Sequence, residues 1–347
     1  MIKSYIFEPN LLCMRNLFLW LLFLGIPYVS QAQYTEMINT NRPGVSQGAF
    51  SVGTNVLQFE TGIFYGKEKH RLLENETTGY GIDYSVRYGV WKEELEVSLI
   101  GAFQRNLITD NRGAIPIEED PISNFRSNTL GAKYLFYDPY RKRTLEGPNL
   151  YSWKANNRFQ WRDLIPAISF YAGANFDTKN NPFTPEVESS ISPKFILSTQ
   201  NNFLGGFVLV TNIIVDRVTT EFPTYGYIVT LTHATNDYFS IFVENQGFKS
   251  DFYSDQLFRA GAAALINENL HVDLSATINI KDTPSVFYGR VGVAYRFDMH
   301  NTDEYIEEKG RAGRKKRKEE KNKKEDDNDG GKKRKDAFEV DDDGGRQ

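Results

Sequence analysis

A period-two alternation of apolar and polar residues runs through most of this chain and constrains its fold more than any other feature. Between 78 and 88, the even-numbered residues are Thr, Tyr, Ile, Tyr, Val and Tyr, whereas the odd-numbered ones are small or charged. Successive side chains of a β-strand point to opposite faces, so this pattern predicts a strand with one apolar and one polar face. The same alternation marks 57–65, 94–104 and 270–280, and weaker versions lie near 128–137, 163–175, 190–199, 206–216, 225–234, 238–246 and 257–266. With a last strand at 286–297, we expect about twelve strands, an even number as in bacterial membrane barrels.

The apolar face of these strands must be covered either by a second sheet or by lipid. Aromatic residues make up 14% of the chain although its mean hydropathy is negative, −0.48. That combination fits a barrel in which only alternate residues touch lipid, with tyrosines at the membrane interfaces. After residue 32, no segment approaches the roughly 20 apolar residues that a transmembrane helix needs. We therefore predict an all-β fold, a transmembrane antiparallel up-and-down β-barrel over 54–298.

The predicted connections sort by length. Links expected to be short are 89–93, 200–205, 234–237 and 267–269, and links expected to be longer are 66–76, 105–124, 176–189, 217–224 and 247–256. Short turns on one rim and long loops on the other are typical of outer-membrane barrels. The exception is 138–162, a long insert on the short-turn side, which is either a periplasmic flap or a sign of a miscounted strand pair.

The first 32 residues are typical of an export signal. Arg15 precedes the apolar run 17–26, and Ser30-Gln31-Ala32 ends it with small residues at the cleavage spacing. A lipoprotein signal at Cys13 is the rival interpretation, but the apolar run follows this cysteine instead of preceding it. Cleavage removes the chain's single cysteine, which excludes disulfides and thiolate sites from the mature protein. Residues 33–53 then form a periplasmic segment ahead of the barrel.

Residues 299–347 form a tail dominated by Lys, Arg, Asp and Glu. Such a composition cannot bury enough apolar surface to offset the entropy of ordering, so we expect a disordered tail. An even strand number and a periplasmic start place it in the periplasm. Its mixed charge argues against nucleic acid and is compatible with a solvated appendage or with contact to peptidoglycan or a periplasmic protein.

The last predicted strand ends in an aromatic pattern. Arg290-x-Gly292-x-x-Tyr295-x-Phe297 resembles the C-terminal signal that the outer-membrane insertion machinery recognises in barrel proteins. This resemblance implies a role in barrel assembly for Gly292, Tyr295 and Phe297, and makes that machinery an expected partner.

The start of the mature chain resembles one barrel family. Residues 38–46 read Ile-Asn-Thr-Asn-Arg-Pro-Gly-Val-Ser, residues 57–62 read Leu-Gln-Phe-Glu-Thr-Gly, and residues 131–134 read Gly-Ala-Lys-Tyr. These motifs are similar to those of the outer-membrane transporter family named for the MetA pathway of phenol degradation. The resemblance covers roughly 38–298 and implies a barrel for the uptake of small, often aromatic molecules. The charged tail and the 138–162 insert depart from the family pattern.

The inward face of the barrel is the expected place for function. The charged residues expected there are Glu60, Asp83, Arg87, Glu96, Lys133, Asp273, Arg290 and Arg296. Both signs occur, which predicts salt-bridged walls and not a ring selective for one charge. The stretch Asn41, Arg42, Pro43 and Gly44 is a candidate plug in which Arg42 pairs with Glu60 or Asp83. The alternative is a tight turn that only anchors the barrel's start.

The sequence gives little support for a catalytic site or a metal site. His271, Asp273 and Ser275 share one face of a strand, but neighbours on that face lie about 6.6–6.8 Å apart, beyond the roughly 2.6–3.2 Å that a nucleophile–base hydrogen bond needs. The four histidines are dispersed, and the acidic stretch 118–120 fits a solvated loop better than a cation site. No glycine-rich phosphate motif follows a strand. We expect no enzyme activity, cofactor or metal.

These features predict an outer-membrane channel for the passive uptake of small, possibly hydrophobic or aromatic, solutes, with lipid around the barrel. The runner-up is a non-conducting structural subunit of an envelope complex that docks through its charged tail.

Overall fold

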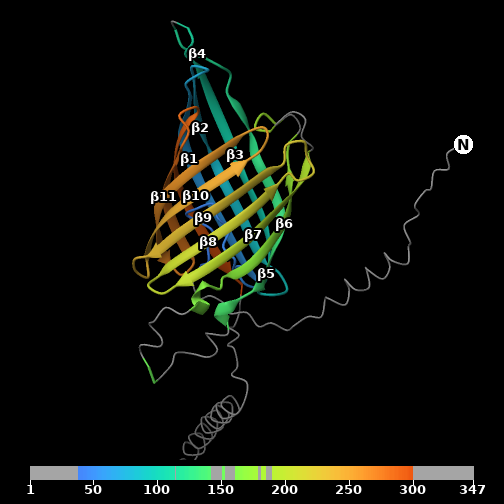
Figure 1. Cartoon of the computed structure of the whole chain (residues 1–347), viewed down its shortest axis with the longest axis vertical. Helices are drawn as coiled ribbons and strands as arrows, with labels where there is room; N and C mark the ends of the chain where they lie inside the picture. The colour runs from blue at the N-terminus through green and yellow to red at the C-terminus, as the bar shows by residue number, and fades with distance from the viewer. Residues whose placement is uncertain are drawn as a thin grey trace, which may run out of the picture. The chain divides into compact units, whose positions relative to one another are not determined.

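A computed structural model describes residues 38–113, 115–141, 151–152, 161–178, 181–184 and 190–299. These residues form a closed antiparallel barrel (Figure 1). The expected signal segment 1–32, the charged tail beyond 299 and most of the 138–162 insert lie outside the described residues. Within the described part of the chain, no helix has the length and apolar character to cross a membrane.

Twelve strands form the barrel wall, and a two-residue strand, β4 (Ile117–Glu118), pairs with the end of β3. The wall strands are β1 (Val56–His70), β2 (Asn75–Gly89), β3 (Leu95–Asp110), β5 (Ile122–Tyr137), β6 (Ala167–Phe176), β7 (Ile191–Phe203), β8 (Phe207–Asp216), β9 (Thr224–Ala234), β10 (Phe239–Lys249), β11 (Ser254–Asn267), β12 (Leu270–Asn279) and β13 (Ser285–Asp298). Each predicted strand is present, so the all-β barrel with twelve wall strands is confirmed.

The first and last wall strands pair with each other and close the barrel. β1 pairs with β2 on one side and with β13 on the other, with Leu57 opposite Tyr88 and Phe297 respectively. The remaining wall strands pair with their neighbours in chain order. Closure removes free sheet edges, which satisfies the requirement that backbone groups in lipid find partners within the protein.

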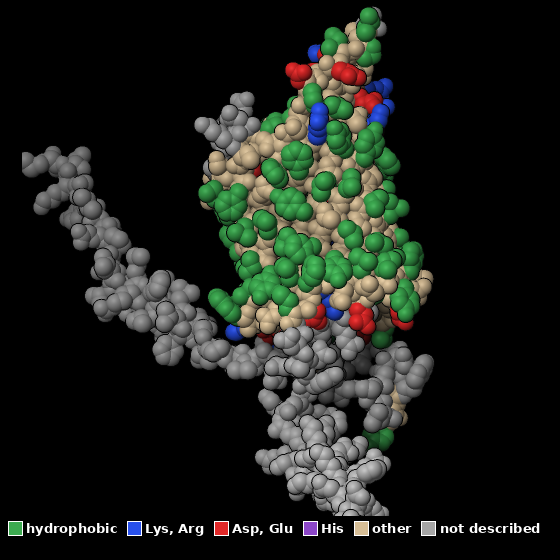
Figure 2. Space-filling model, turned by 180° about the vertical axis from the view of Figure 1, so that it is seen from behind, with side chains coloured by type: hydrophobic (Ala, Val, Ile, Leu, Met, Phe, Trp, Pro, Cys, Tyr) green, Lys and Arg blue, Asp and Glu red, His purple; other side chains and the backbone are tan. Residues whose placement is uncertain are grey.

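The alternation predicted from the sequence separates the two faces of the wall. On the outward face, Ile63, Leu274 and Val291 are 67%, 60% and 60% exposed. On the inward face, Gln58 and Arg87 are 0% and 1% exposed. Figure 2 shows the outward apolar side chains as a broad band across the visible face of the barrel. The barrel is therefore apolar outside and polar inside, the reverse of a soluble protein, as a membrane barrel requires.

Two segments that we expected to be loops are mostly strand. Strand β1 continues to His70 and β2 begins at Asn75, so only 71–74 remain of the predicted loop 66–76. Similarly, β3 reaches Asp110 and β5 begins at Ile122, within the predicted loop 105–124. Since about 9–11 residues span a bilayer, these strands of 15 or 16 residues continue past the membrane on the rim away from the N-terminal segment (Figure 1). There β1 continues in charged residues, and the ends of β3 and β5 mix polar and apolar residues without regular alternation, so the apolar pattern did not mark these parts as strand.

The 138–162 insert joins β5 directly to β6, which pair with each other, so no strand pair was miscounted. Its described parts contact the rim formed by β7 and β8. Tyr140 Oη accepts a hydrogen bond from Asn202 N (2.6 Å), and Asp163 O, in the short helix η1 (Trp161–Leu164), accepts one from Asn201 Nδ2 (3.3 Å). The described residues at the two ends of the insert therefore lie on the rim where the N-terminal segment enters.

The two faces of β12 give a test of the barrel's place in lipid. Replacing Leu274 with Arg puts a charge on the outward face in mid-strand, and we expect it to lower the free energy of unfolding by about 2–4 kcal/mol. The matched change Leu204→Arg, in the turn before β8, should cost no more than about 1 kcal/mol, because a turn lies near the interface. Urea unfolding of protein refolded in vesicles measures both, and equal losses would contradict the lipid-facing assignment of β12.

Candidate functional site

The N-terminal segment, residues 38–55, lies inside the barrel. It begins beside the β11–β12 turn, where Ile38 N donates to Glu268 O (2.9 Å), and it ends at the start of β1. Between these points its backbone hydrogen-bonds to inward side chains of β1, β3, β7, β8 and β10. We call residues 38–55 the lumen segment, because they contact the wall on several sides.

Arg42 lies between two aspartates of the wall. Its Nε and Nη2 donate to Asp273 on β12 (2.7 and 3.1 Å), and its Nη1 donates to Asp83 on β2 (2.5 Å). Burial by itself lowers the pKa of Arg42, but hydrogen bonds and charge attraction from Asp273 and Asp83 outweigh it and raise the pKa above its usual value. Because Arg42 is only 8% exposed, removing one partner of this cluster would leave a charge uncompensated in a site with little water.

Two glycines make room for the Arg42 guanidinium. Asp83, Gly62, Gly292 and Asp273 are successive register partners on β2, β1, β13 and β12. A Cβ built on Gly62 would lie 2.4 Å from Arg42 Nη2, and one built on Gly292 would lie 1.9 Å from the same atom. Any side chain at these positions would displace the guanidinium. Arg42 therefore lies over the seam between the first and last strands and ties the strands on either side of it.

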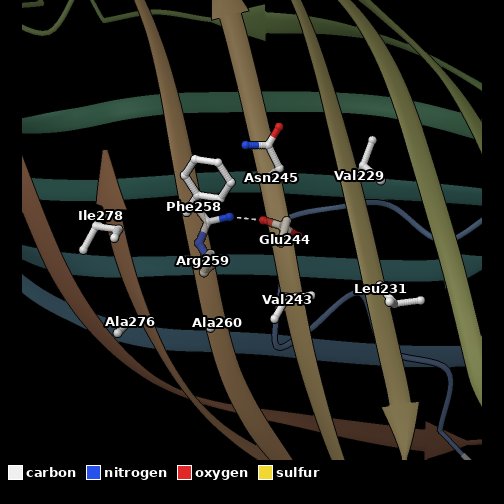
Figure 3. Close-up of a pocket in the computed structure, with 10 residues that line it drawn as sticks. All are labelled: Val229, Leu231, Val243, Glu244, Asn245, Phe258, Arg259, Ala260, Ala276 and Ile278. Carbon is white, nitrogen blue, oxygen red and sulfur yellow. Dashed lines mark hydrogen bonds and ion pairs between the residues drawn. The ribbon is translucent and has the colours of Figure 1, made fainter. Parts of the chain in front are cut away.

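A second group of contacts holds Val45 and Ser46. Glu244 on β10 accepts hydrogen bonds from Val45 N (3.0 Å) and Ser46 N (3.4 Å), and Arg259 on β11 pairs with the same carboxylate (Figure 3). Thr230 Oγ1 lies 2.7 Å from Glu244 Oε2 and 2.8 Å from Ser46 Oγ. The carboxylate is thus shared between the barrel wall and the lumen segment.

A third group lies near the rim where the lumen segment enters. Arg87 pairs with Glu60 (3.1 Å) and Glu96 (2.8 Å), and Lys133 Nζ lies 3.5 Å from Glu96. The same side chains reach the lumen segment: Arg87 donates to Asn39 O (2.8 Å), Lys133 donates to Gly48 O (3.0 Å) and Phe50 O (2.9 Å), and Glu96 accepts from Val52 N (3.1 Å). Arg87 and Lys133 are each 1% exposed, so the lumen is filled at this level.

Six of the eight wall residues named from the sequence belong to these groups: Glu60, Asp83, Arg87, Glu96, Lys133 and Asp273. Arg290 joins them through Asp83, with Nε 3.0 Å from Oδ2. Arg296 lies apart and donates to Asn269 Oδ1 (2.8 Å) in the β11–β12 turn. The structure thus brings seven of the eight together.

The four residues of the predicted plug motif make separate contacts. Asn41 N donates to Glu60 (3.2 Å), and Gly44 packs so closely on Glu244 that a Cβ there would lie 2.3 Å from Oε2. Pro43 is buried between them. Arg42 pairs with Asp83, one of its two expected partners, and with Asp273 in place of Glu60.

Sequence reasoning missed several wall residues that bind the lumen segment. Besides Glu244, Asn212 on β8 exchanges two hydrogen bonds with Gln47 (2.6 and 2.8 Å), and Gln200 on β7 accepts from Ala49 N (3.1 Å). All three occupy inward positions of strands whose alternation is weak. The register of these strands, extended from the stronger ones, would have placed them in the lumen.

The residues considered for catalysis or metal binding do not form a catalytic or metal-binding arrangement among the described residues. Asp273 is bound to Arg42, and within the described residues no hydrogen bond joins His271, Asp273 and Ser275 to one another. In the same part of the chain, no cluster of three His, Cys, Asp or Glu has the geometry to hold a metal ion.

The C-terminal aromatic pattern divides between the two faces of β13. Tyr295 and Phe297 point outward, are 40% and 49% exposed, and contact each other edge to face with ring centroids 4.6 Å apart. Gly292 points inward beneath Arg42. The proximity of Arg42 therefore gives a local steric reason for glycine at position 292.

The hollow in Figure 3 opens mainly on the outer face of the wall. It has a volume of about 550 Å³, and most of its lining comes from outward apolar side chains of β9 to β12, among them Leu231, Val243, Ala260 and Ala276. It faces lipid and does not form part of the lumen.

Comparison with known proteins identifies a family. The profile of the family described as "Putative MetA-pathway of phenol degradation" matches residues 40–297. No curated protein matches the chain.

Solved structures share only the barrel. An outer membrane channel from Pseudomonas putida F1 has a TM-score of 0.45 at 7% identity, covering 75% of this chain and all of that one. The toluene transporter TodX of Pseudomonas putida has a TM-score of 0.40 at 8% identity, covering 78% and 95%. The translocator domain of the autotransporter NalP from Neisseria meningitidis has a TM-score of 0.39 at 12% identity, covering 71% and 89%. Likenesses this distant carry no argument about function.

Removing Arg42 should destabilise the barrel. We expect Arg42→Ala to lower the free energy of unfolding by about 3–5 kcal/mol, because Asp273 is left buried without its cation. Arg112→Ala, at an exposed Arg112–Asp110 pair, should lower the free energy of unfolding far less, because water screens that pair. Urea unfolding in vesicles measures both, and a loss for Arg42→Ala no larger than that of Arg112→Ala would refute the role given to this cluster.

The space that Gly292 leaves for the Arg42 guanidinium can be tested with two glycine substitutions in β13. We expect Gly292→Ala to cost about 1–3 kcal/mol, because the methyl overlaps the guanidinium. Gly289→Ala is the matched control, since a Cβ there would meet only Tyr65 O, at 3.9 Å. In the Arg42→Ala background the cost of Gly292→Ala should largely disappear. If it persists there, Gly292 acts through something other than Arg42.

Proposed function

The chain belongs to the family described as "Putative MetA-pathway of phenol degradation", and on that premise we propose that it is an outer-membrane channel for the passive uptake of small apolar or aromatic solutes. The family's description supplies the solute class. The closed barrel with an apolar exterior supplies the location, since such a wall is stable only in a membrane. The barrel is a channel protein and not an enzyme in this proposal.

One observation carries the mechanism: polar contacts hold the lumen segment in the barrel. Hydrogen bonds and ion pairs to Asp83, Asp273, Glu244 and Asn212 fix it, and water can replace such contacts group by group. Among the described residues, the buried apolar cluster that the lumen segment joins is small and lies at the entry rim, around Ala49, Leu135 and Ala167. We infer that the lumen segment is a plug whose displacement opens a path for solute.

A second function is favoured by the tight filling near the entry rim. Gln58, Arg87 and Lys133 are almost completely buried, which is also the state expected of a barrel that never conducts. Such a protein would be a structural subunit of the envelope, with the charged tail as its docking segment. Flux separates the two functions, since only the channel requires the lumen segment to move.

A cysteine pair tests whether the lumen segment gates the barrel. Ser46 Oγ and Thr230 Oγ1 lie 2.8 Å apart, close enough for sulfurs at both positions to bond. We expect Ser46→Cys/Thr230→Cys to pass phenol and small sugars into liposomes when reduced. Oxidation, which ties the segment to β9, should reduce flux to that of empty vesicles.

Each single cysteine variant is the control, because it can form no internal disulfide and its flux should not depend on oxidant. Folding is verified by heat-dependent gel mobility. Flux that is unchanged by the disulfide would overturn the plug. Absence of flux from the folded, reduced pair and from the unsubstituted protein would overturn the channel and favour the structural subunit.

A further inference from the structure

The outer face of the barrel carries a cluster of cations where the long strands leave the membrane. Lys67 and Lys69 on β1 point outward, with side chains 49% and 63% exposed, and Arg105 on β3 is exposed on the same face. Tyr65 and Tyr80 are register partners between them, 56% and 38% exposed. We call these five residues the basic–aromatic platform.

The register places the platform on three adjacent strands, β1, β2 and β3, with β13 beside β1. Lys67 is opposite Phe287 on β13, Lys69 is opposite Glu76 on β2, and Tyr80 is opposite Arg105. Figure 2 shows charged side chains gathered on the narrow part of the barrel beyond the apolar band. Along β1, Lys67 lies two residues beyond Tyr65 and four beyond Ile63, about 7 and 13 Å at the rise of a strand. The cations therefore lie just outside the lipid-facing belt.

The charge of this face is only partly compensated within it. Glu76 lies 2.5 Å from Lys67 and 3.3 Å from Lys69, so two ammonium groups share one carboxylate. Arg105 adds a third cation. On the outward positions of β13, β1, β2 and β3 from the apolar band to the strand ends, Glu76 is the single carboxylate among the described residues. The platform carries two positive charges in excess.

A hollow of about 450 Å³ lies beside the two lysines. It is lined by Tyr65, Lys67, Lys69 and, from β13, Val286 and Phe287. Its lower edge is aromatic and continues into the lipid-facing surface, whereas its upper edge is cationic. An amphiphile with an anionic head and apolar chains matches both edges at once.

We propose that the basic–aromatic platform binds the phosphate groups of a phosphorylated lipid in the outer leaflet, with the lipid's acyl chains against Ile63, Tyr65 and Phe287. Ammonium and guanidinium groups donate hydrogen bonds to phosphate oxygens, and arginine can do so with two donors. The position at the membrane boundary selects a lipid phosphate over a soluble one. This site is independent of whether the barrel conducts.

The test is lipid binding to the full-length protein in detergent micelles, with bound lipid counted by native mass spectrometry. The probes are bisphosphorylated lipid A and the same lipid without its phosphates. We expect the phosphorylated form to bind more tightly, and Lys67→Gln/Lys69→Gln/Arg105→Gln to weaken its binding by at least about tenfold, since each cation near an anionic surface contributes roughly a fivefold factor.

The matched control removes three other cations of the same rim, as Arg71→Gln/Lys249→Gln/Lys281→Gln. It should retain the affinity of the unsubstituted protein. Equal weakening in the control, or equal binding of the dephosphorylated lipid, would overturn the proposal. Displacement of bound lipid by inorganic phosphate would show a site for free phosphate and would also overturn it.

A second variant works in the opposite direction and covers a failure of the triple variant to fold. Glu76→Gln removes the carboxylate that competes for both lysines, so we expect tighter binding of bisphosphorylated lipid A by a few-fold and no change for the dephosphorylated form. Unchanged or weaker binding by Glu76→Gln would count against the platform.

Discussion

Closure of the barrel is the constraint on which the rest of this structure depends. In lipid, a strand without a neighbour leaves backbone groups without hydrogen-bond partners, so β1 and β13 must meet. A closed wall of twelve strands is wider than side chains alone fill, and its interior must then hold water, solute or part of the chain. In this protein it holds residues 38–55, and Arg42 lies over the seam where closure occurs.

The electrostatics of the lumen follow from that arrangement. Charged side chains removed from water are stable only when they are paired and hydrogen-bonded. The wall and the lumen segment supply partners to each other: Arg42 lies between Asp83 and Asp273, and the backbone of 45–46 caps Glu244 beside Arg259. The same polar chemistry that stabilises the filled barrel also makes its opening conceivable, because water can hydrate each group that is released. An apolar plug would exchange less readily with water or with solute.

The outer face obeys the opposite requirement. Apolar side chains form a broad surface toward lipid, and the cations Lys67, Lys69 and Arg105 lie where β1 and β3 continue beyond it. The transition from Ile63 through Tyr65 to Lys67 on a single strand mirrors the order of chain, interface and head group in a lipid leaflet. One period-two pattern thus builds a lumen on one side of the wall and a lipid surface on the other.

The sequence by itself determined the class of fold, the number of wall strands and the face of the wall on which each charge of the strong strands lies. These properties are local, because the direction of a side chain depends only on whether its position along the strand is even or odd. The same alternation predicted that Glu60, Asp83, Arg87 and Asp273 point toward the lumen. It could not show that 66–70 and 105–110 are strands, because 66–70 contains no apolar residue and the adjacent Leu107 and Ile108 break the alternation in 105–110.

Only the tertiary structure decided which groups meet. Arg42 is 231 residues from Asp273, and Val45 is 199 residues from Glu244. Such partners are set by the register around the whole barrel, which accumulates over every strand between them. The need for glycine at 62 and 292 is equally invisible in the sequence, because it arises from an arginine that crosses the lumen from another segment. The alternation of side chains within each strand specifies the barrel wall. The contacts of the lumen segment are specified only when that wall closes around it.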